Sequence, residues 1–154
     1  MENIILIKEE IDCDIETAFT MFIDNNYLEN WLTVKADVNP EVGGKYELFW
    51  VPEDRKSNST IGCRITGIDR NKFISFNWKG PTDFESFMNS ADPLTHIIVF
   101  LFQNDSNSNK TFIYLFHTGW RNGSEWNKAR NYFQNAWSKA LWILKKKIAD
   151  KQLP

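Results

Sequence analysis

Cysteine and histidine are scarce in this sequence, with two of each among 154 residues. Cys13 and Cys63 form no Cys-x-x-Cys pair and show no metal-ligand spacing, so we expect two reduced, buried thiols that act as small hydrophobic side chains. His96 and His117 lie far apart along the chain, and no tight cluster of His, Cys, Asp and Glu is present. Because a metal site needs three or four converging ligands, we expect neither a metal nor another cofactor.

The sequence also lacks a surplus of one charge and a long apolar run. Its 18 basic and 20 acidic residues leave a formal net charge of −2, which gives no reason to expect a nucleic-acid partner. No stretch approaches the length of a membrane span, and the first residues, MENIILIKEEID, have no basic segment typical of a secretory signal. We therefore expect a cytoplasmic protein with no membrane partner.

Motifs for covalent catalysis are missing as well. There is no Gly-x-Ser-x-Gly turn, and Gly43-Gly44 is not followed by the Lys-Ser/Thr of a phosphate-binding loop. General acid–base chemistry by His117 with an acid such as Glu47 stays open. We assign no catalytic residue, and whether the protein is an enzyme is left open, with binding favoured.

What the sequence does contain is aromatic side chains, which make up 15% of the residues and include seven Trp and twelve Phe. The hydrophobic share of 42% and the charged share of 25% are typical of a soluble globular protein. At this length one hydrophobic core is sufficient, and no linker or repeat divides the chain. We expect a single domain over residues 1–154 with a wide aromatic interior.

The first part of the chain predicts one strand and two short helices. Residues 4–11 alternate as a strand, and Asp14 is suited to cap the helix that follows. Asn25 and Asn26 are expected to break that helix, before a second helical segment over residues 27–32. The apolar residues of the first helix recur at helical spacing: Ile15, Ala18, Phe19, Phe22 and Ile23.

The middle of the chain has the alternation of β-strands without intervening helices, which favours an antiparallel meander. A polar loop is expected over residues 104–109 and a long irregular connection over residues 80–93. That connection could cover the mouth of a cavity or be pinned to the surface by its apolar residues. The expected strands cover residues 45–50, 60–68, 73–78, 94–103 and 110–118, and the apolar residues of the connection are Phe84, Phe87 and Met88.

The final segment, from Ser124 to about Ile148, has the strongest helical pattern in the chain. Ser124 is expected to be the N-cap, and the basic run at residues 145–147 complements the dipole at the helix end. One apolar stripe runs along the helix through Trp126, Ala129, Phe133, Ala136, Trp137, Ala140, Leu141, Leu144 and Ile148. A curved sheet could close on this stripe.

Four segments, NPEVGGKY at 39–46, ISFNW at 74–78, HTGW at 117–120 and WSKAL at 137–141, resemble motifs of the activator-of-heat-shock-ATPase homologue family. This family is a branch of the START-like, or SRPBCC, superfamily with the helix-grip fold. The resemblance implies an α+β domain in which a curved, seven-stranded antiparallel sheet wraps around the long C-terminal helix, with two short helices after the first strand. It also implies a cavity between sheet and helix.

Relatives in the superfamily bind lipids, sterols, polyketides or flavonoid-like molecules, and a few are cyclases or hydrolases. The resemblance and the aromatic faces together predict a domain that binds an apolar or aromatic small molecule. A plain aromatic core, with histidines satisfied by the backbone, is the competing interpretation. The residues expected at the ligand are Trp31, Phe49, Phe76, Trp78, His96, His117, Trp120, Trp126, Phe133 and Trp137.

A second hypothesis is a protein-interaction domain, because some aromatic residues are expected to face solvent. Phe112, Tyr114 and Phe116 alternate with another apolar set, so both faces of their strand are apolar unless a neighbouring element covers one of them. Trp142 lies nine residues after Phe133, about 180° around the helix from the apolar stripe. The partner would be a second copy of the chain or a chaperone.

Overall fold

The computed structural model describes residues 3–153, so residues 1–2 and 154 of the expected domain lie outside the described residues. Seven strands and three short helices precede the long final helix in the described residues. In chain order they are β1 (Ile5–Ile11), α1 (Ile15–Ile23), α2 (Asn25–Trp31), β2 (Lys35–Val38), β3 (Tyr46–Phe49), β4 (Ile65–Asp69), β5 (Phe73–Trp78), α3 (Glu85–Met88), β6 (Thr95–Asn104), β7 (Asn107–Thr118) and α4 (Ser124–Ala149).

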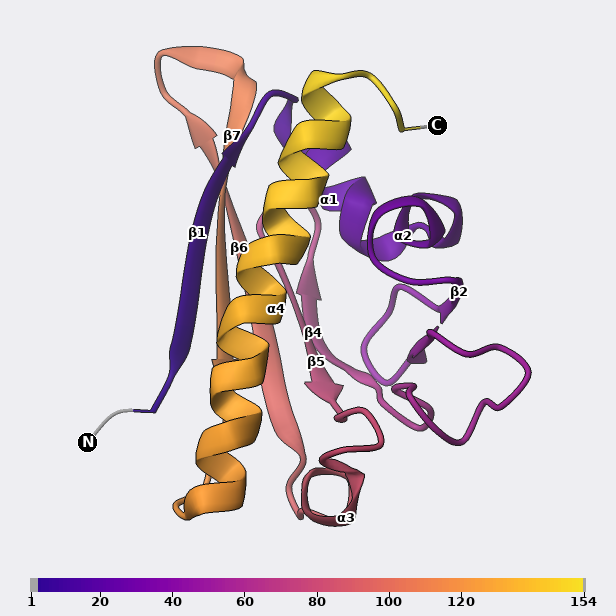
Figure 1. Cartoon of the computed structure of the whole chain (residues 1–154). Coiled ribbons are helices and arrows are strands. Elements are labelled where there is room, and N and C mark those ends of the chain that lie inside the picture. Colours follow the sequence, from indigo (N-terminus) through magenta and orange to yellow (C-terminus); the bar gives the residue numbers. More distant parts are fainter. Residues whose placement is uncertain (1–2, 154) are drawn as a thin grey trace.

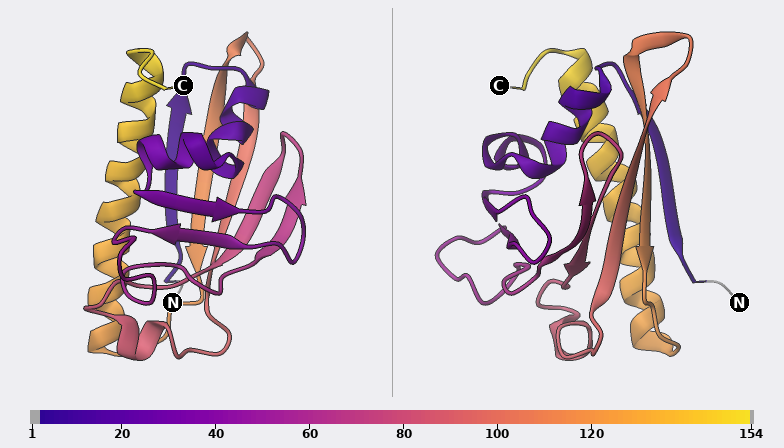
Figure 2. Two further views of the ribbon diagram at one scale, coloured as in Figure 1. Left: turned by 90° about the vertical axis from the view of Figure 1, so that its right-hand side faces the viewer. Right: turned by 180° about the vertical axis from the view of Figure 1, so that it is seen from behind.

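The strands confirm the expected α+β fold with a curved antiparallel sheet. Five of them pair in the order β1-β7-β6-β5-β4, and β2 pairs with β3 in a ribbon that runs across the direction of the other strands (Figure 2, left). The ribbon joins the larger sheet where Lys45 pairs with Arg64, next to the start of β4. α4 lies along one face of the larger sheet, with α1 and α2 beside its C-terminal half (Figure 1).

The two faces of the large sheet have different surroundings. On β6 and β7 every second side chain is buried, and these residues form the inner face under the helices: Thr95, Ile97, Val99, Leu101, Thr111, Ile113, Leu115 and His117. The alternate residues form the outer face, and none of the helices that the structure describes lies on it (Figure 2, right). The core therefore lies entirely on the α4 side of the sheet.

α4 ends within one residue of the expected position and buries the expected stripe, including Phe133, Trp137 and Leu141. The expected N-cap is wrong, however, because Ser124 is the first helical residue and Gly123 occupies the cap with φ of 123° and no side-chain hydrogen bond. Among residues 3–153, no helix is both long and apolar enough to cross a membrane.

The expected helix break at Asn25 and Asn26 is also wrong, because both residues belong to the first turn of α2. The Asp24 carboxylate accepts hydrogen bonds from the backbone N–H groups of Asn26 (2.9 Å) and Tyr27 (3.2 Å). It therefore satisfies two of the donors that a helix leaves free at its N-terminus. One capping residue thus separates α1 from α2.

The strand expected over residues 60–68 begins five residues later, at Ile65. The reason is Thr60, whose buried hydroxyl accepts from Leu48 N–H (2.9 Å) and donates to the Tyr46 carbonyl (3.0 Å). These side-chain hydrogen bonds hold the segment around Thr60 against β3 without the regular backbone hydrogen-bond pattern of paired strands.

Three other features differ from the sequence-based expectation: two additional elements and the length of one hairpin. β2 is an additional strand that the pattern did not reveal, and the connection over residues 80–93 contains the short helix α3. β6 and β7 extend into the expected loop, and the hairpin between them closes over Asp105 and Ser106. The side chain of Asn104 accepts from Ser106 N–H (2.8 Å), so a local polar bond makes the turn shorter than its composition indicated.

Candidate ligand-binding site

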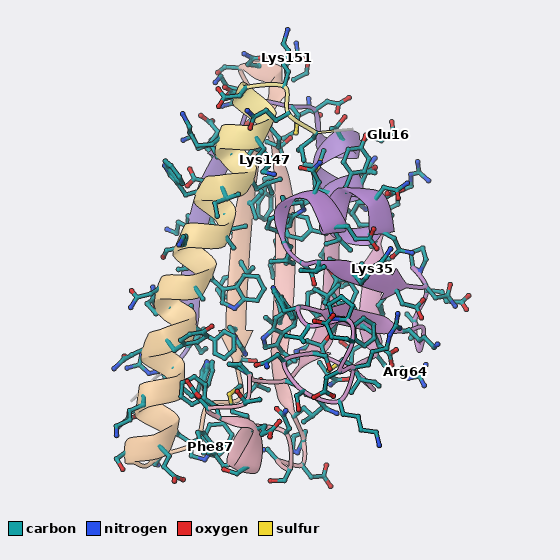
Figure 3. The ribbon with its side chains drawn as sticks, turned by 45° about the vertical axis from the view of Figure 1, so that its right-hand side comes forward. Glu16, Lys35, Arg64, Phe87, Lys147 and Lys151 are labelled. Carbon is teal, nitrogen blue, oxygen red and sulfur yellow. The ribbon has the colours of Figure 1, made fainter. Side chains whose placement is uncertain are left out.

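A pocket of about 410 Å³ lies between the middle turns of α4 and the ends of α2, β3 and β5. Its walls are mostly apolar and aromatic, with a few polar side chains. The lining residues are Trp31, Leu32, Trp50, Val51, Asn58, Ser59, Trp78, Lys79, Gly80, Pro81, Tyr132, Phe133, Ala136, Trp137, Lys139, Ala140 and Ile143. In Figure 3, Lys147 lies on the C-terminal part of α4, and Phe87 of α3 lies near the other end of this helix.

One helical face supplies the α4 wall of the pocket. Tyr132, Ala136, Lys139 and Ile143 follow each other at spacings of four, three and four residues and so lie on one side of the helix. This side adjoins the buried stripe that contains Phe133 and Trp137. The helix therefore packs on the sheet through the buried stripe and borders the pocket with the adjoining face.

At the pocket floor, tryptophans pack against one another. The Trp78 ring centroid lies 5.1 Å from that of Trp137 and 6.0 Å from that of Trp50. Lys147 of α4 donates hydrogen bonds to the carbonyl (2.8 Å) and side-chain oxygen (3.0 Å) of Asn30, and so ties α4 to α2 beside Trp31. The aromatic floor is thus held by contacts among four elements.

Of the four tryptophans that line the pocket, three donate their indole N–H to a partner within the described chain. Trp31 donates to the Met21 carbonyl (2.9 Å) and Trp50 to the Leu32 carbonyl (3.0 Å). Trp78 is 3% exposed, and within the described chain its Nε1 has no hydrogen-bond partner. Because buried donors in proteins are nearly always paired, this N–H requires an explanation.

His117 is fully buried, and both of its ring nitrogens form hydrogen bonds. Its Nδ1 accepts from the Trp137 indole N–H (3.1 Å), which places the proton on Nε2, and Nε2 donates to the Thr95 hydroxyl (3.1 Å). The Thr95 hydroxyl donates onward to the Trp78 carbonyl (3.3 Å). A chain of hydrogen bonds therefore links the two tryptophans of the floor through His117.

Burial lowers the pKa of His117 to about 3, with the nearby His96 as a smaller cause. The imidazole is therefore neutral, and its geometry suits it to hold Trp137 and Trp78 in place. It is not among the residues that line the pocket. Glu47, the acid considered as its partner, instead accepts a hydrogen bond from Gly62 N–H (2.8 Å).

Of the ten residues expected at the ligand, Trp31, Trp78, Phe133 and Trp137 line the pocket. Four others are packed elsewhere on the inner side. Phe76 stacks on Tyr46 with centroids 3.8 Å apart, and the Arg55 guanidinium lies 4.4 Å from the Phe49 ring centroid. Trp120 and Trp126 extend the aromatic cluster toward α3, where Phe87 contacts Trp126 at 5.1 Å between centroids (Figure 3).

His96 projects to the outer face of the sheet, opposite to His117. Its Nε2 lies 2.6 Å from the Thr66 hydroxyl, which lies 2.8 Å from the Ser75 hydroxyl. Burial lowers the pKa of His96, which favours its neutral form. Within residues 3–153 no side chain is hydrogen-bonded to its Nδ1, so the pair lacks the third group that orients the base in a nucleophilic triad.

The connection over residues 80–93 is pinned at the pocket edge. The Asn89 side chain accepts from Gly80 N–H (2.7 Å) and donates to the Gly80 carbonyl (3.1 Å), and Met88 is fully buried. Phe84 packs edge-on against Tyr132, with centroids 5.3 Å apart. These contacts favour the interpretation of a fixed surface loop over that of a lid.

The two thiols have environments that suppress reactivity. Burial is the main cause that raises the pKa of Cys63 and of Cys13, each to about 12, so neither is a thiolate near neutral pH. Both are free. In the part of the chain that the structure describes, no three His, Cys, Asp or Glu side chains are grouped as a metal site requires.

The outer face of the sheet carries a continuous group of aromatic rings, which we call the outer aromatic face. Phe100 contacts Phe73, Phe102 and Phe116 with centroid distances of 6.0, 6.5 and 5.9 Å. Phe102 is 51% exposed and Phe112 36%, and Tyr114 is partly exposed, so no element of residues 3–153 covers the face. Trp142 is also exposed, as expected, but it lies on α4 and belongs to a different surface.

Several pocket residues were absent from the sequence-based site. The face with Tyr132, Ala136 and Ile143 could have been found from its helical spacing beside the main stripe. Trp50 and Lys79 follow the ends of β3 and β5, and only the tertiary arrangement brings these ends to α4.

A curved antiparallel sheet that wraps a long C-terminal helix defines a START-like, helix-grip domain. The family model described as "Activator of Hsp90 ATPase homolog 1-like protein" matches residues 12–149, and the chain belongs to this family. A search of curated proteins found no match.

Solved structures with the same fold include proteins from distant organisms. Protein MLL2253 from Mesorhizobium loti superposes with a TM-score of 0.73 at 16% identity, over 96% of this chain and 97% of that one. PFC0360w, an HSP90 activator from Plasmodium falciparum, gives 0.68 at 19% identity, over 98% and 97%. The Aha1 dimer from Colwellia psychrerythraea gives 0.67 at 18% identity, over 94% and 95%. At these identities the likeness establishes the fold.

Proposed function

We propose that this protein is a nonenzymatic binding domain for an apolar or aromatic small molecule, held in the pocket beside α4. The observation that carries this proposal is the pocket itself, whose aromatic wall includes Trp31, Trp50, Trp78 and Trp137. Its volume of about 410 Å³ lies within the range of small-molecule sites, which are mostly apolar with a few polar groups.

The packing around the pocket supports a preformed site. Trp137 and Trp78 are held through His117, and α4 is tied to α2 through Lys147. A wall fixed in this way loses little conformational entropy when a ligand enters, which favours binding.

The test is a titration of the ¹⁵N-labelled protein with flavonoids, sterols and fatty acids, followed by NMR. We expect at least one class to shift the signals of Trp78, Trp137 and Ala136 in a saturable way, and residues of the outer face such as Phe102 to stay unchanged. If no class perturbs the pocket signals, binding in this pocket is contradicted.

Two matched variants locate the site. Ala136→Trp places a large side chain in the pocket wall and should abolish the saturable shifts while the fold is kept, as judged by circular dichroism. Lys128→Trp adds the same side chain at an exposed α4 position that does not border the pocket, and should leave binding unchanged. Equal binding by both variants would place the ligand elsewhere.

A second candidate function is self-association through the outer aromatic face, with a second copy of the chain as the partner. The specific observation is the exposure of Phe102, which contacts Phe100 and Tyr114, and of Phe112, which lies opposite Phe102 in the strand pair. A relative of the same fold was solved as a dimer, which supports a second copy as the partner.

Sedimentation of Phe102→Lys and of Trp142→Lys at micromolar concentration tests this candidate. The wild-type chain and Trp142→Lys should sediment as dimers and Phe102→Lys as a monomer, because only Phe102 lies in the outer aromatic face. A monomeric wild-type chain would contradict self-association and leave a heterologous partner, such as a chaperone, for that face.

A further inference from the structure

Trp142 differs from the other tryptophans of residues 3–153 because its ring packs against no other aromatic ring. Each of the other six has at least one such contact. Trp142 also has no cation over its ring, and it is 55% exposed. A single exposed apolar side chain is ordinary on a protein surface, so the meaning of this one depends on the residues around it.

Lysines occupy three of the four positions that neighbour Trp142 on the surface of α4. Lys139 precedes it by three residues, and Lys145 and Lys146 follow it by three and four, the spacings at which helical side chains lie side by side. Ser138 holds the fourth position, and all five residues are exposed. We call these five residues the Trp142 patch.

Two of the three lysines have charges that are available to a partner. Lys139 forms no salt bridge within residues 3–153. Lys146 lies 3.9 Å from the Asp150 carboxylate, in a pair so exposed that it contributes little, whereas Lys145 pairs with Glu9 at 3.0 Å. The two available lysines lie on opposite sides of the tryptophan, at steps of about 5 and 6 Å along the helix axis.

The patch belongs to a wider asymmetry of charge. α4 carries six of the 18 basic residues and one of the 20 acidic residues, so its formal charge is +5 and that of the rest of the chain is −7. The acidic residue, Glu125, lies in the first turn, about 25 Å along the helix from Trp142. A negatively charged partner is therefore attracted to α4 rather than to the remainder of the molecule.

From the charges and the ring together we infer that the Trp142 patch binds an acidic segment of another protein, with an apolar side chain of that segment against the indole. Charge complementarity selects carboxylates for Lys139 and Lys146, and tryptophan is among the residues that most often anchor protein interfaces. In an extended segment alternate side chains point to one side, about 7 Å apart. An acidic, an apolar and a second acidic residue at alternate positions thus face Lys139, Trp142 and Lys146 in turn.

Two other polyanions fit the patch less well. A membrane surface requires a broad apolar face on the helix, but α4 directs its apolar stripe at the sheet and exposes a single large apolar ring among these lysines. A nucleic-acid strand extends past the patch over the rest of the chain, whose formal charge repels phosphates. The inference stands independently of ligand binding in the pocket, although Lys139 also borders the pocket.

The probe is a capped, fluorescein-labelled peptide, Glu-Ser-Asp-Ser-Phe-Ser-Asp-Ser-Glu, whose binding is followed by fluorescence anisotropy. One control peptide has serine in place of the phenylalanine, and a second has amides in place of all the carboxylates. The protein is also labelled with ¹⁵N-tryptophan, and Trp142→Phe assigns the indole signal of Trp142 by its loss.

We expect the probe to bind saturably at low salt and to shift the Trp142 signal. The peptide without phenylalanine should bind about tenfold more weakly, because the apolar contact with the indole is lost. The amide peptide should bind at least about tenfold more weakly, and the affinity of the probe should fall steeply toward about 1 M NaCl, because the attraction is between exposed charges.

Matched variants locate the binding surface. Trp142→Ser should weaken the probe about tenfold or more, and Lys139→Gln and Lys146→Gln about two- to fivefold each. Lys128→Gln removes an exposed lysine from α4 away from the patch, and Phe102→Ser removes an exposed ring from the outer aromatic face. Both should leave the affinity unchanged, and circular dichroism verifies that all variants fold.

Several results would overturn the inference. They are the absence of saturable binding of the probe, equal binding of the probe and its control peptides, and unchanged binding by Trp142→Ser. Tighter binding of phosphatidylserine vesicles or of oligothymidine, with a shift of the Trp142 signal, would assign the patch to a membrane or a nucleic acid instead. A Trp142 signal that moves when the protein alone is diluted would assign it to a second copy of the chain.

Discussion

The hydrogen bond from the Trp137 indole determines which ring nitrogen of His117 carries the proton, and burial keeps the ring neutral. Because an indole N–H can only donate, Nδ1 must be unprotonated, and the fully buried ring has a pKa of about 3. The unfolded chain takes up a proton near the ordinary value of 6.5, and the folded chain does so only near 3. Folding is therefore coupled to proton release between these two pH values.

The first prediction is that the free energy of unfolding falls as the pH falls from about 6.5 toward 3. His117 contributes up to about 1.4 kcal/mol per pH unit in this window and nothing above it, because the unfolded state then binds no extra proton. Urea unfolding of the wild type and of His117→Gln between pH 5 and 7 measures the difference. Parallel pH profiles for the two proteins would show that His117 does not titrate as described.

Gly44 occupies a position with no room for a side chain. A Cβ there would lie 2.2 Å from the Asn39 carbonyl oxygen and 2.9 Å from that of Glu41, both of them backbone atoms that cannot rotate away. Gly44 N–H also donates to the Glu41 carbonyl (2.9 Å), so the turn before β3 is closely packed.

We accordingly predict that Gly44→Ala costs about 1–3 kcal/mol of stability, because the turn must open to relieve the overlap. Val42→Ala in the same turn is the control and should cost little, since Val42 is 66% exposed. Thermal or urea unfolding measures both. A Gly44→Ala protein as stable as Val42→Ala would contradict the packing of this turn.

At the scale of elements, two consecutive residues of α4 have opposite environments. Leu141 is fully buried against the sheet, and Trp142 is 55% exposed. A large aromatic residue thus contributes little to the packing of the helix, while its smaller neighbour contributes much.

The third prediction follows from this pair. Leu141→Ala should destabilise the fold by about 2–5 kcal/mol, through lost burial and the cavity left behind, whereas Trp142→Ser should change stability by less than about 0.5 kcal/mol. Urea denaturation followed by circular dichroism compares them. A larger effect of Trp142→Ser would require a different rotation of α4 about its axis.

The connection between β5 and β6 is the second element with a testable property. Asn89 closes it onto Gly80 with two hydrogen bonds, and Met88 anchors it in the core. We predict slow hydrogen exchange at Gly80 without any ligand, and an acceleration of about tenfold or more in Asn89→Ala. Fast exchange at Gly80 in the wild type would support a mobile lid instead.

At the scale of the whole molecule, one hydrophobic core joins the large sheet, the ribbon and the helices. Tyr46 and Leu48 of β3 are buried in the same cluster as Phe76 of β5 and Leu141 of α4. The Tyr46 hydroxyl also donates to the Phe22 carbonyl (2.7 Å), which connects the ribbon to α1. Within residues 3–153, the ribbon therefore shares its buried residues Tyr46 and Leu48 with the core of the large sheet.

The fifth prediction is therefore a single cooperative unfolding transition, as expected of one domain. Urea transitions followed by far-ultraviolet circular dichroism and by tryptophan fluorescence should coincide. An earlier transition in fluorescence alone would indicate that the ribbon, with its neighbour Trp50, unfolds as a separate unit.

Much of the fold was predictable because the decisive patterns are local. The helix with its apolar stripe and the strands expected over residues 94–103 and 110–118 follow from the sequence pattern, and α4, β6 and β7 confirm these elements. The errors lie where a side chain satisfies backbone groups, as Asp24 does before α2 and Thr60 does beside β3. Such bonds depend on partners that hydrophobic periodicity does not reveal.

The site was predictable only in part. The aromatic content by itself determined that the interior is rich in flat side chains, because the shape of a side chain is fixed by its residue type. Only the tertiary structure decided which rings meet: His96 and His117, both expected at the ligand, project to opposite faces of the sheet, and Trp50 and Lys79 reach the pocket from the ends of different strands. The physical reason is that a pocket forms between elements distant in sequence, whose relative placement is determined by the packing of the whole core.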